Sequence, residues 1–146
     1  MNLQDLANVA NVATALVAIP AALFALFQLL EMKRSAQLTG FRAVIDFLQE
    51  ERVRVARRIT ISLNGKALSD WTKAEEEAAD LALRKFNSVA LMVKERMISP
   101  ELVLTEWKTS LLLCWDAAKP LVEKYRSERF PTYWQHLEVL CSRARQ

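Results

Sequence analysis

The residue types that carry most enzyme chemistry are sparse in this chain. His136 is the only histidine, and Cys114 and Cys141 are the only cysteines. A lone histidine on a helical pattern is more often structural than a base or a ligand, and two distant cysteines lack the spacing of a zinc site. The two glycines of the chain cannot build a Gly-rich phosphate loop. The sequence therefore predicts no catalytic, cofactor-binding or metal-binding residue, and we expect a protein that is not an enzyme.

The densest charged segment, from Glu50 to Arg58, is the best candidate for binding an anion. On a helix, Arg54, Arg57 and Arg58 share one face. Three interpretations stay open: a solvated face with ion pairs such as Glu50–Arg54, a contact with anionic lipid headgroups, and a site for nucleic acid or a nucleotide. Neighbouring acidic residues cancel much of the positive field, which favours the solvated face and disfavours nucleic acid as a partner.

The elements that hold these residues are expected to be helices. Two glycines and four prolines leave little turn material, and no stretch alternates like a half-buried strand. The strongest single signal is apolar, since no charged residue occurs from Leu6 to Leu30. About twenty helical residues cross a hydrocarbon core of about 30 Å. We predict an all-α protein with a transmembrane anchor and its basic flank over residues 1–34, and a cytoplasmic bundle of about four helices over 35–146.

The flanks of the apolar segment predict its orientation. A cleaved signal peptide would have a basic start and a shorter apolar run, whereas Asp5 precedes this one. Lys33, Arg34 and Arg42 follow it, and basic flanks stay in the cytoplasm. We therefore expect a single-pass signal-anchor in the inner (cytoplasmic) membrane, with the N-terminus outside. The alternative is a soluble bundle in which this helix is buried.

One face of the apolar helix differs from the other. Small and polar residues recur there at steps of three and four: Asn11, Thr14, Ala18, Ala22, Ala25 and Gln28. In lipid, small residues allow close approach of two backbones, and amide side chains form hydrogen bonds across the interface. This face predicts a contact within a homo-oligomer or with another membrane protein. The alternative is that alanine is simply common in membrane spans.

The remaining pattern divides the second part of the chain into helices. The first is expected over 41–63, with Gly40 as a soft point before it and Asn64-Gly65 as its stop. Thr72 and Glu75 form a capping box that opens the second helix. Ser99-Pro100 opens the third, Pro120 bends or interrupts it, and Pro131 opens the last. The four tryptophans are expected to be core residues: Trp71, Trp107, Trp115 and Trp134.

Several of these segments together resemble a known family. They are the apolar helix, FRAVIDFLQEERVRVARR (41–58), Trp71, KERMISPELV (94–103), Trp115, Pro120 and Tyr133-Trp134. The chain resembles an uncharacterised bacterial membrane-anchored family known only as a domain of unknown function. The resemblance covers nearly the whole chain, and it implies a bacterial or phage-related setting and an N-terminal anchor. It implies no catalytic or binding residue.

Three functions are consistent with these observations. The first is a non-enzymatic, membrane-tethered helical interaction module, or scaffold, that assembles with itself or a partner. The second is a membrane-active effector or small channel formed by oligomerised spans, acting in phage defence or toxicity. The third is a soluble partner-binding bundle. The lipid bilayer and further copies of the chain or a membrane protein are the expected partners, and no small-molecule substrate is evident.

Overall fold

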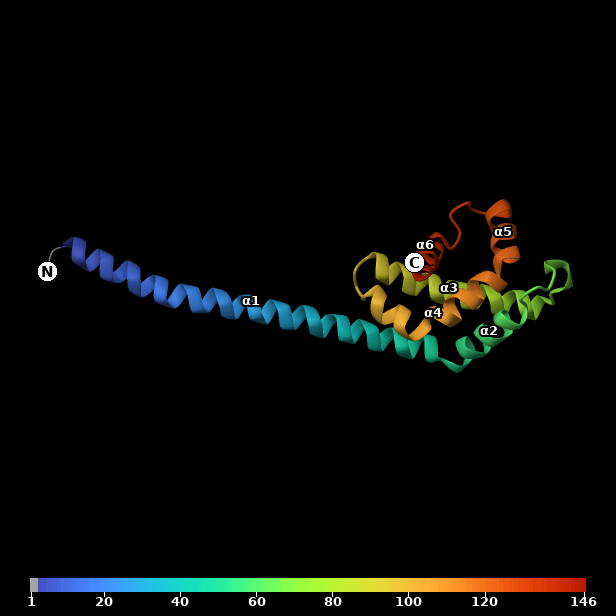
Figure 1. The fold of residues 1–146 in the computed structure, drawn as a ribbon, viewed down its shortest axis with the longest axis horizontal. Coiled ribbons are helices and arrows are strands. Elements are labelled where there is room, and N and C mark those ends of the chain that lie inside the picture. The colour runs from blue at the N-terminus through green and yellow to red at the C-terminus, as the bar shows by residue number, and fades with distance from the viewer. Residues whose placement is uncertain (1–2) are drawn as a thin grey trace. The chain divides into compact units, whose positions relative to one another are not determined.

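In the computed structural model, the backbone is described for residues 3–146, and the side chains for Thr14 and residues 16–146. Every regular element in this part of the chain is a helix, which confirms the all-α prediction (Figure 1). The elements are α1 (Leu3–Gln49), α2 (Glu51–Ser62), the short 3-10 helix η1 (Leu68–Asp70), α3 (Lys73–Lys94), α4 (Pro100–Ala117), α5 (Lys119–Glu128) and α6 (Gln135–Ala144). The chain divides into two compact units, Met1–Ala36 and Gln37–Gln146, which are described separately below.

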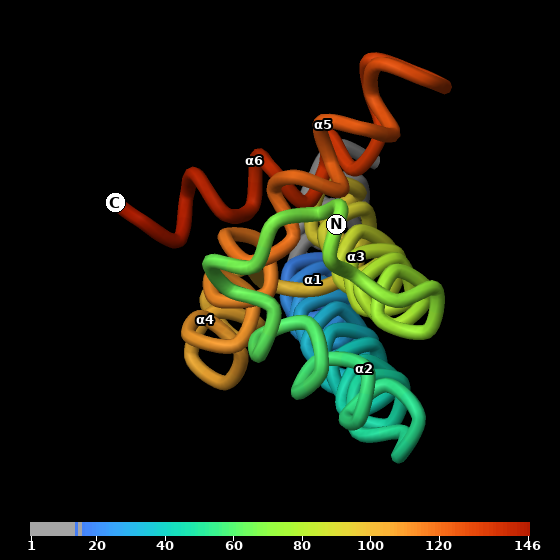
Figure 2. The backbone as a smooth tube through the Cα atoms, turned by 90° about the vertical axis from the view of Figure 1, so that its right-hand side faces the viewer, coloured from blue at the N-terminus to red at the C-terminus, as the bar shows by residue number. Residues whose placement is uncertain are grey.

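The second unit is a helical bundle built around α3. This helix contacts α2, α4, α5 and α6, and the views of the bundle place these helices around it (Figures 1 and 2). Apolar side chains from every helix of the unit meet in one core, among them Val44, Leu48, Val53, Leu83, Phe86, Val89, Leu111, Leu121 and Leu137. All four tryptophans are buried in it, as predicted. The last turns of α1 thus belong to the core of the bundle.

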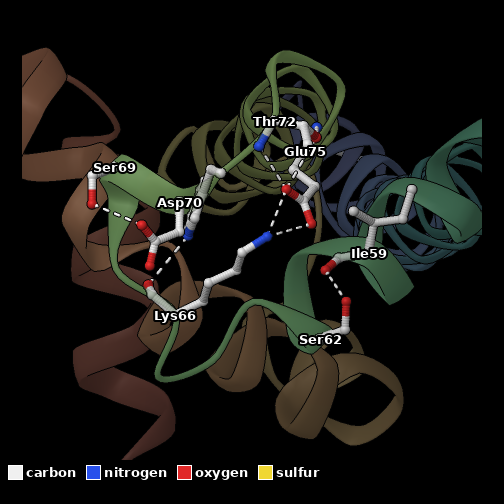
Figure 3. Close-up of polar contacts among 8 residues, drawn as sticks. Ile59, Ser62, Lys66, Ser69, Asp70, Thr72 and Glu75 are labelled. Atoms are coloured by element: carbon white, nitrogen blue, oxygen red, sulfur yellow. Dashed lines mark hydrogen bonds and ion pairs between the residues drawn. The ribbon is translucent and has the colours of Figure 1, made fainter.

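The connection from α2 to α3 follows the predicted turn and cap signals. Gly65 has φ of +79°, a left-handed conformation that glycine adopts at little cost. Thr72 and Glu75 form the capping box, and Lys66 Nζ lies 2.9 Å from the Glu75 carboxylate (Figure 3). The Trp71 indole N–H donates to the Lys66 carbonyl at 3.2 Å. Contacts of Lys66 with Trp71 and Glu75 therefore join the beginning of this connection to its end.

The helix predicted over 41–63 is two helices, which corrects the sequence prediction. The break falls at Glu50, where ψ is 129°. Leu48 and Val53 are both buried, yet five residues advance a straight helix by about 140°, so they would lie on nearly opposite faces. The break restores both side chains to the core. It leaves the apolar side chain of Val55 exposed.

The prediction that Gly40 is a soft point is also wrong, because α1 is helical through it. A Cβ atom at this position would lie 3.0 Å from Cγ2 of Ile98 and 3.2 Å from the Met97 carbonyl oxygen. These distances are tighter than ordinary van der Waals contact. Gly40 therefore serves close packing of α1 against the turn between α3 and α4.

The C-terminal part of the bundle contains one confirmed break and one corrected boundary. Pro120 lies in the first turn of α5, and Ala118 separates α5 from α4, so of the two predicted outcomes the helix is interrupted and not merely bent. The last helix begins at Gln135 and not at Pro131, because Trp134 has φ of +54°. The amide oxygen of Asn87, on α3, accepts from the Leu137 N–H at 3.1 Å. A side chain from another helix thus caps α6.

Candidate functional site

The first unit carries apolar side chains that no core covers. Residues 16–36 are exposed, and the large apolar side chains between Leu16 and Leu30 are 55 to 71 % exposed. The helix is long and apolar enough to cross a membrane. Apolar patches of this extent on a protein surface mark sites that another apolar phase covers. This helix is the first candidate site.

The residues predicted to form a helix–helix contact lie in this exposed stretch. Ala18, Ala22, Ala25 and Gln28 are exposed, and so is Thr14. The side chain of Asn11 lies outside the described residues. Pro20 lies inside α1 without interrupting it. Helical spacing therefore places the described members on one side of a continuous helix, and Gln28 is the single amide among them.

The second candidate site is the arginine cluster, Arg54, Arg57 and Arg58. Two of these arginines lie at the surface, and the third turns into the bundle. Arg54 and Arg58 lie at the surface and approach the carboxylate of Glu51 at 3.3 and 3.9 Å. Glu50, expected to pair with Arg54, instead pairs with Lys85 of α3 at 3.3 Å. Exposed pairs of this kind contribute at most about 1 kcal/mol. These arginines are arranged as on a solvated face.

Arg57 is different, because its guanidinium group turns into the bundle. Nη2 donates to the Leu48 carbonyl at 3.1 Å, and Nη1 donates to Ser110 Oγ at 3.4 Å. Its Nε is buried and has no partner among the described residues. Burial lowers the pKa of the Arg57 guanidinium from its ordinary value. Arg57 thus binds a free carbonyl at the end of α1, where a cation is favoured.

Lys85, on α3, contacts residues on either side of the break between α1 and α2. Its ammonium nitrogen lies 3.8 Å from the centroid of the Phe47 ring, in addition to its contact with Glu50. A cation over an aromatic face is attracted by the quadrupole of the ring. The sequence analysis missed this role, since nothing in the spacing of Lys85 distinguishes it from a surface lysine.

Neither of the two cysteines is in the state of a reactive thiol. The thiols of Cys114 and Cys141 are buried, and this burial raises the pKa of each to about 12. Such thiols stay protonated at neutral pH and are poor nucleophiles. Among the described residues, no group of three or more His, Cys, Asp or Glu side chains is arranged to hold a metal ion.

The fold and the exposed helix together define a class: an all-α bundle that follows one helix long and apolar enough to span a membrane. The chain belongs to the DUF4760 family, described as a domain of unknown function, whose model matches residues 13–144. This confirms the resemblance to an uncharacterised family. No curated protein and no solved structure matches the chain.

Proposed function

We propose that this protein is a non-enzymatic helical interaction module, tethered to a membrane by α1 and working through assembly with further copies of itself. The observation that carries the proposal is the exposure of every described side chain from Leu16 to Leu30. Each buried CH₂ group contributes about 0.8 kcal/mol, so a helix of this composition is strongly favoured in lipid over water. The bundle, by contrast, already has a complete core.

The flanking charges support the proposed topology. Lys33 and Arg34 follow the apolar stretch and are exposed. Cationic flanks are retained on the cytoplasmic side of a membrane. We therefore place the bundle in the cytoplasm and the N-terminus on the outer side of the inner membrane of a bacterial cell.

Self-assembly is supported by the amide of Gln28. Its side chain is exposed and has no hydrogen-bond partner among the described residues. In lipid an amide without a partner is costly, and a second helix supplies one. Ala25 lies about one turn before Gln28 and Ala22 about one turn before Ala25, and small residues admit a close neighbour. Each such polar contact contributes about 1 kcal/mol.

Fractionation tests the anchor. We expect the full chain to stay with membranes after carbonate extraction, and protease added from outside to spare the bundle. Leu23→Arg places a charge at mid-span at a cost of about 3 kcal/mol and is expected to release much of the chain. Leu113→Arg, at an exposed leucine of α4, is the matched control and should leave membrane association unchanged. Carbonate extraction of the unaltered chain would refute the anchor.

Size measurement in nanodiscs tests the assembly. We expect an oligomer that Ala22→Leu weakens, because the larger side chain holds two helices apart. Leu16→Ile, on the face opposite to Ala25, keeps the side-chain volume and should leave the oligomer intact. A monomer at all protein concentrations would remove self-assembly from the proposal and leave the anchor standing.

A further inference from the structure

The turn between α3 and α4 combines exposed cationic and apolar side chains. Met97 is 59 % exposed, and Leu91, one and a half turns earlier, is 41 % exposed. Lys94 and Arg96 lie beside them, are exposed, and have no ion-pair partner among the described residues. Glu95 is the one acidic residue of the turn itself. Apolar side chains flanked by cations form the combination that binds an anionic membrane surface.

The backbone of this turn is well fixed. The Arg96 N–H donates to the Val93 carbonyl at 3.0 Å, and the Met97 N–H donates to the Met92 carbonyl at 2.9 Å. These two bonds form a Schellman motif, in which the residue at the position of Arg96 is left-handed and usually glycine. Arg96 adopts φ of +58° there. A cation thus occupies a position where glycine would carry a lower backbone cost.

A short length of chain connects the apolar stretch to the part of α1 on which this turn packs. The Met97 carbonyl and the Ile98 side chain pack on Gly40, so the turn lies where α1 joins the bundle. Roughly ten residues of α1 separate Leu30 from Gly40, which is about 15 Å of helix. Lys and Arg side chains extend several ångströms further, and a charge is felt over a Debye length of about 8 Å. Whatever the orientation of the bundle, this turn has a short tether to the bilayer.

We infer that the turn from Lys94 to Met97 docks on the anionic headgroups of the membrane that holds α1. This inference rests on the proposed anchor. Lys94 and Arg96 contact lipid phosphates, and Met97 inserts among the upper acyl carbons. The contact gives the bundle a fixed face toward the bilayer. The connection from α2 to α3 lies at the opposite end of the bundle (Figure 1). In this proposal, that end stays in the aqueous phase.

Site-specific fluorescence in the full chain tests this contact. An environment-sensitive dye is attached at Met97→Cys or, as the control, at Ser69→Cys in η1. The control lies at the other end of α3, whose 22 residues span about 33 Å. Cys114 and Cys141 are buried, and the unaltered chain corrects for any labelling of them. In nanodiscs with phosphatidylglycerol, we expect spin-labelled lipids to quench the dye at 97 and to spare the dye at 69.

Charge variants then separate headgroup binding from simple proximity. Lys94→Gln, which removes one cation, is expected to weaken the contact about fivefold, whereas Lys73→Gln makes the same change in net charge and should have no effect. Arg96→Gly removes a cation from the turn without perturbing its backbone, so a fall in quenching here cannot come from unfolding.

The possible failures are distinct. If carbonate fails to extract the chain but the dye at 97 is quenched no more than the dye at 69, the inference is wrong and the anchor stands. Equal quenching in phosphatidylcholine and phosphatidylglycerol would also overturn it, because the contact would then not depend on the charge of the headgroups. If carbonate extracts the chain, the proposed function fails and this inference fails with it.

Discussion

Residues 16–30 of α1 and the whole of α3 are both regular helices rich in apolar residues. They differ in what they expose to solvent: α3 exposes mainly polar side chains, and residues 16–30 expose apolar ones. In α3 the apolar residues Ala79, Leu83, Phe86 and Ala90 are buried, and charged side chains cover the other face. In residues 16–30 large apolar side chains are exposed all round. A one-sided apolar stripe is satisfied by the protein itself, whereas an apolar surface all round needs an external apolar phase. The distribution, more than the amount, of apolar residues distinguishes the two helices.

The largest expected effect comes from truncating the same residue type in both helices. Phe86→Ala removes a side chain that is 0 % exposed and should lower the free energy of unfolding of the bundle by about 3–5 kcal/mol. Phe24→Ala removes one that is 62 % exposed and should leave this free energy unchanged. Tryptophan fluorescence in denaturant measures the difference, because all four tryptophans lie in the bundle. Comparable losses in both variants would break the distinction between the two helices.

The next effect concerns the arginines at the break after α1. Arg57→Ala leaves the Leu48 carbonyl without its donor and should cost about 2 kcal/mol of stability. Arg54→Ala removes only an exposed pair with Glu51 and should cost less than about 0.5 kcal/mol. Arg57→Met is the informative third variant, since it fills the space without the charge and should recover part of the loss. If all three variants were equally stable, the role assigned to Arg57 would be wrong.

These two comparisons indicate how far the sequence could predict the fold. The exposed helix, the capping box at Thr72 and the interruption at Pro120 were predicted because each depends on residues adjacent in the chain. The break at Glu50 was missed because it depends on Leu48, Val53 and a donor nine residues away. A change of phase in the apolar pattern, from Leu48 to Val53, was the available signal. A single change of this kind does not by itself divide a helix predicted over 41–63 into two.

The candidate site was likewise predicted only where it depends on residues close together in the chain. Helical spacing alone placed Arg54, Arg57 and Arg58 on one face, but it could not tell which of them turns inward. That choice depends on Ser110 and Leu48, which only the packing of α4 and α1 brings near. Gly40 was read as flexible for the same reason, since its partner, Ile98, lies far along the chain. The exposed face of α1 needed no such information.

A smaller effect is expected at the start of α6, which no residue of its own caps. Asn87→Ala removes the acceptor of the Leu137 N–H and should lower the free energy of unfolding by about 1 kcal/mol. Ser88→Ala is the neighbouring control, because the Ser88 hydroxyl only bonds back to its own helix. Hydrogen exchange at Leu137 is the sharper readout and should accelerate in Asn87→Ala alone. An unchanged rate would show that α6 is held by its packing and not by this cap.

The smallest effect concerns pH, because α3 carries a titratable group that stabilises the bundle and residues 16–30 of α1 carry none. The Thr72 backbone N–H and then the Lys66 ammonium hold the pKa of Glu75 below its usual range. A carboxylate with a lowered folded pKa stabilises the fold above its unfolded pKa, and this contribution is lost as the pH falls through the folded value. Denaturation of the bundle followed from pH 7 to pH 3 should therefore show a stability difference between the unaltered chain and Glu75→Gln that shrinks in acid. Glu77→Gln, at an exposed neighbour in the same turn, is the control for the loss of a carboxylate near the start of α3. Because the described residues between Thr14 and Leu30 carry no titratable side chain, membrane retention should not follow this pH dependence. Retention that fell together with Glu75 titration would show that the anchor depends on the bundle.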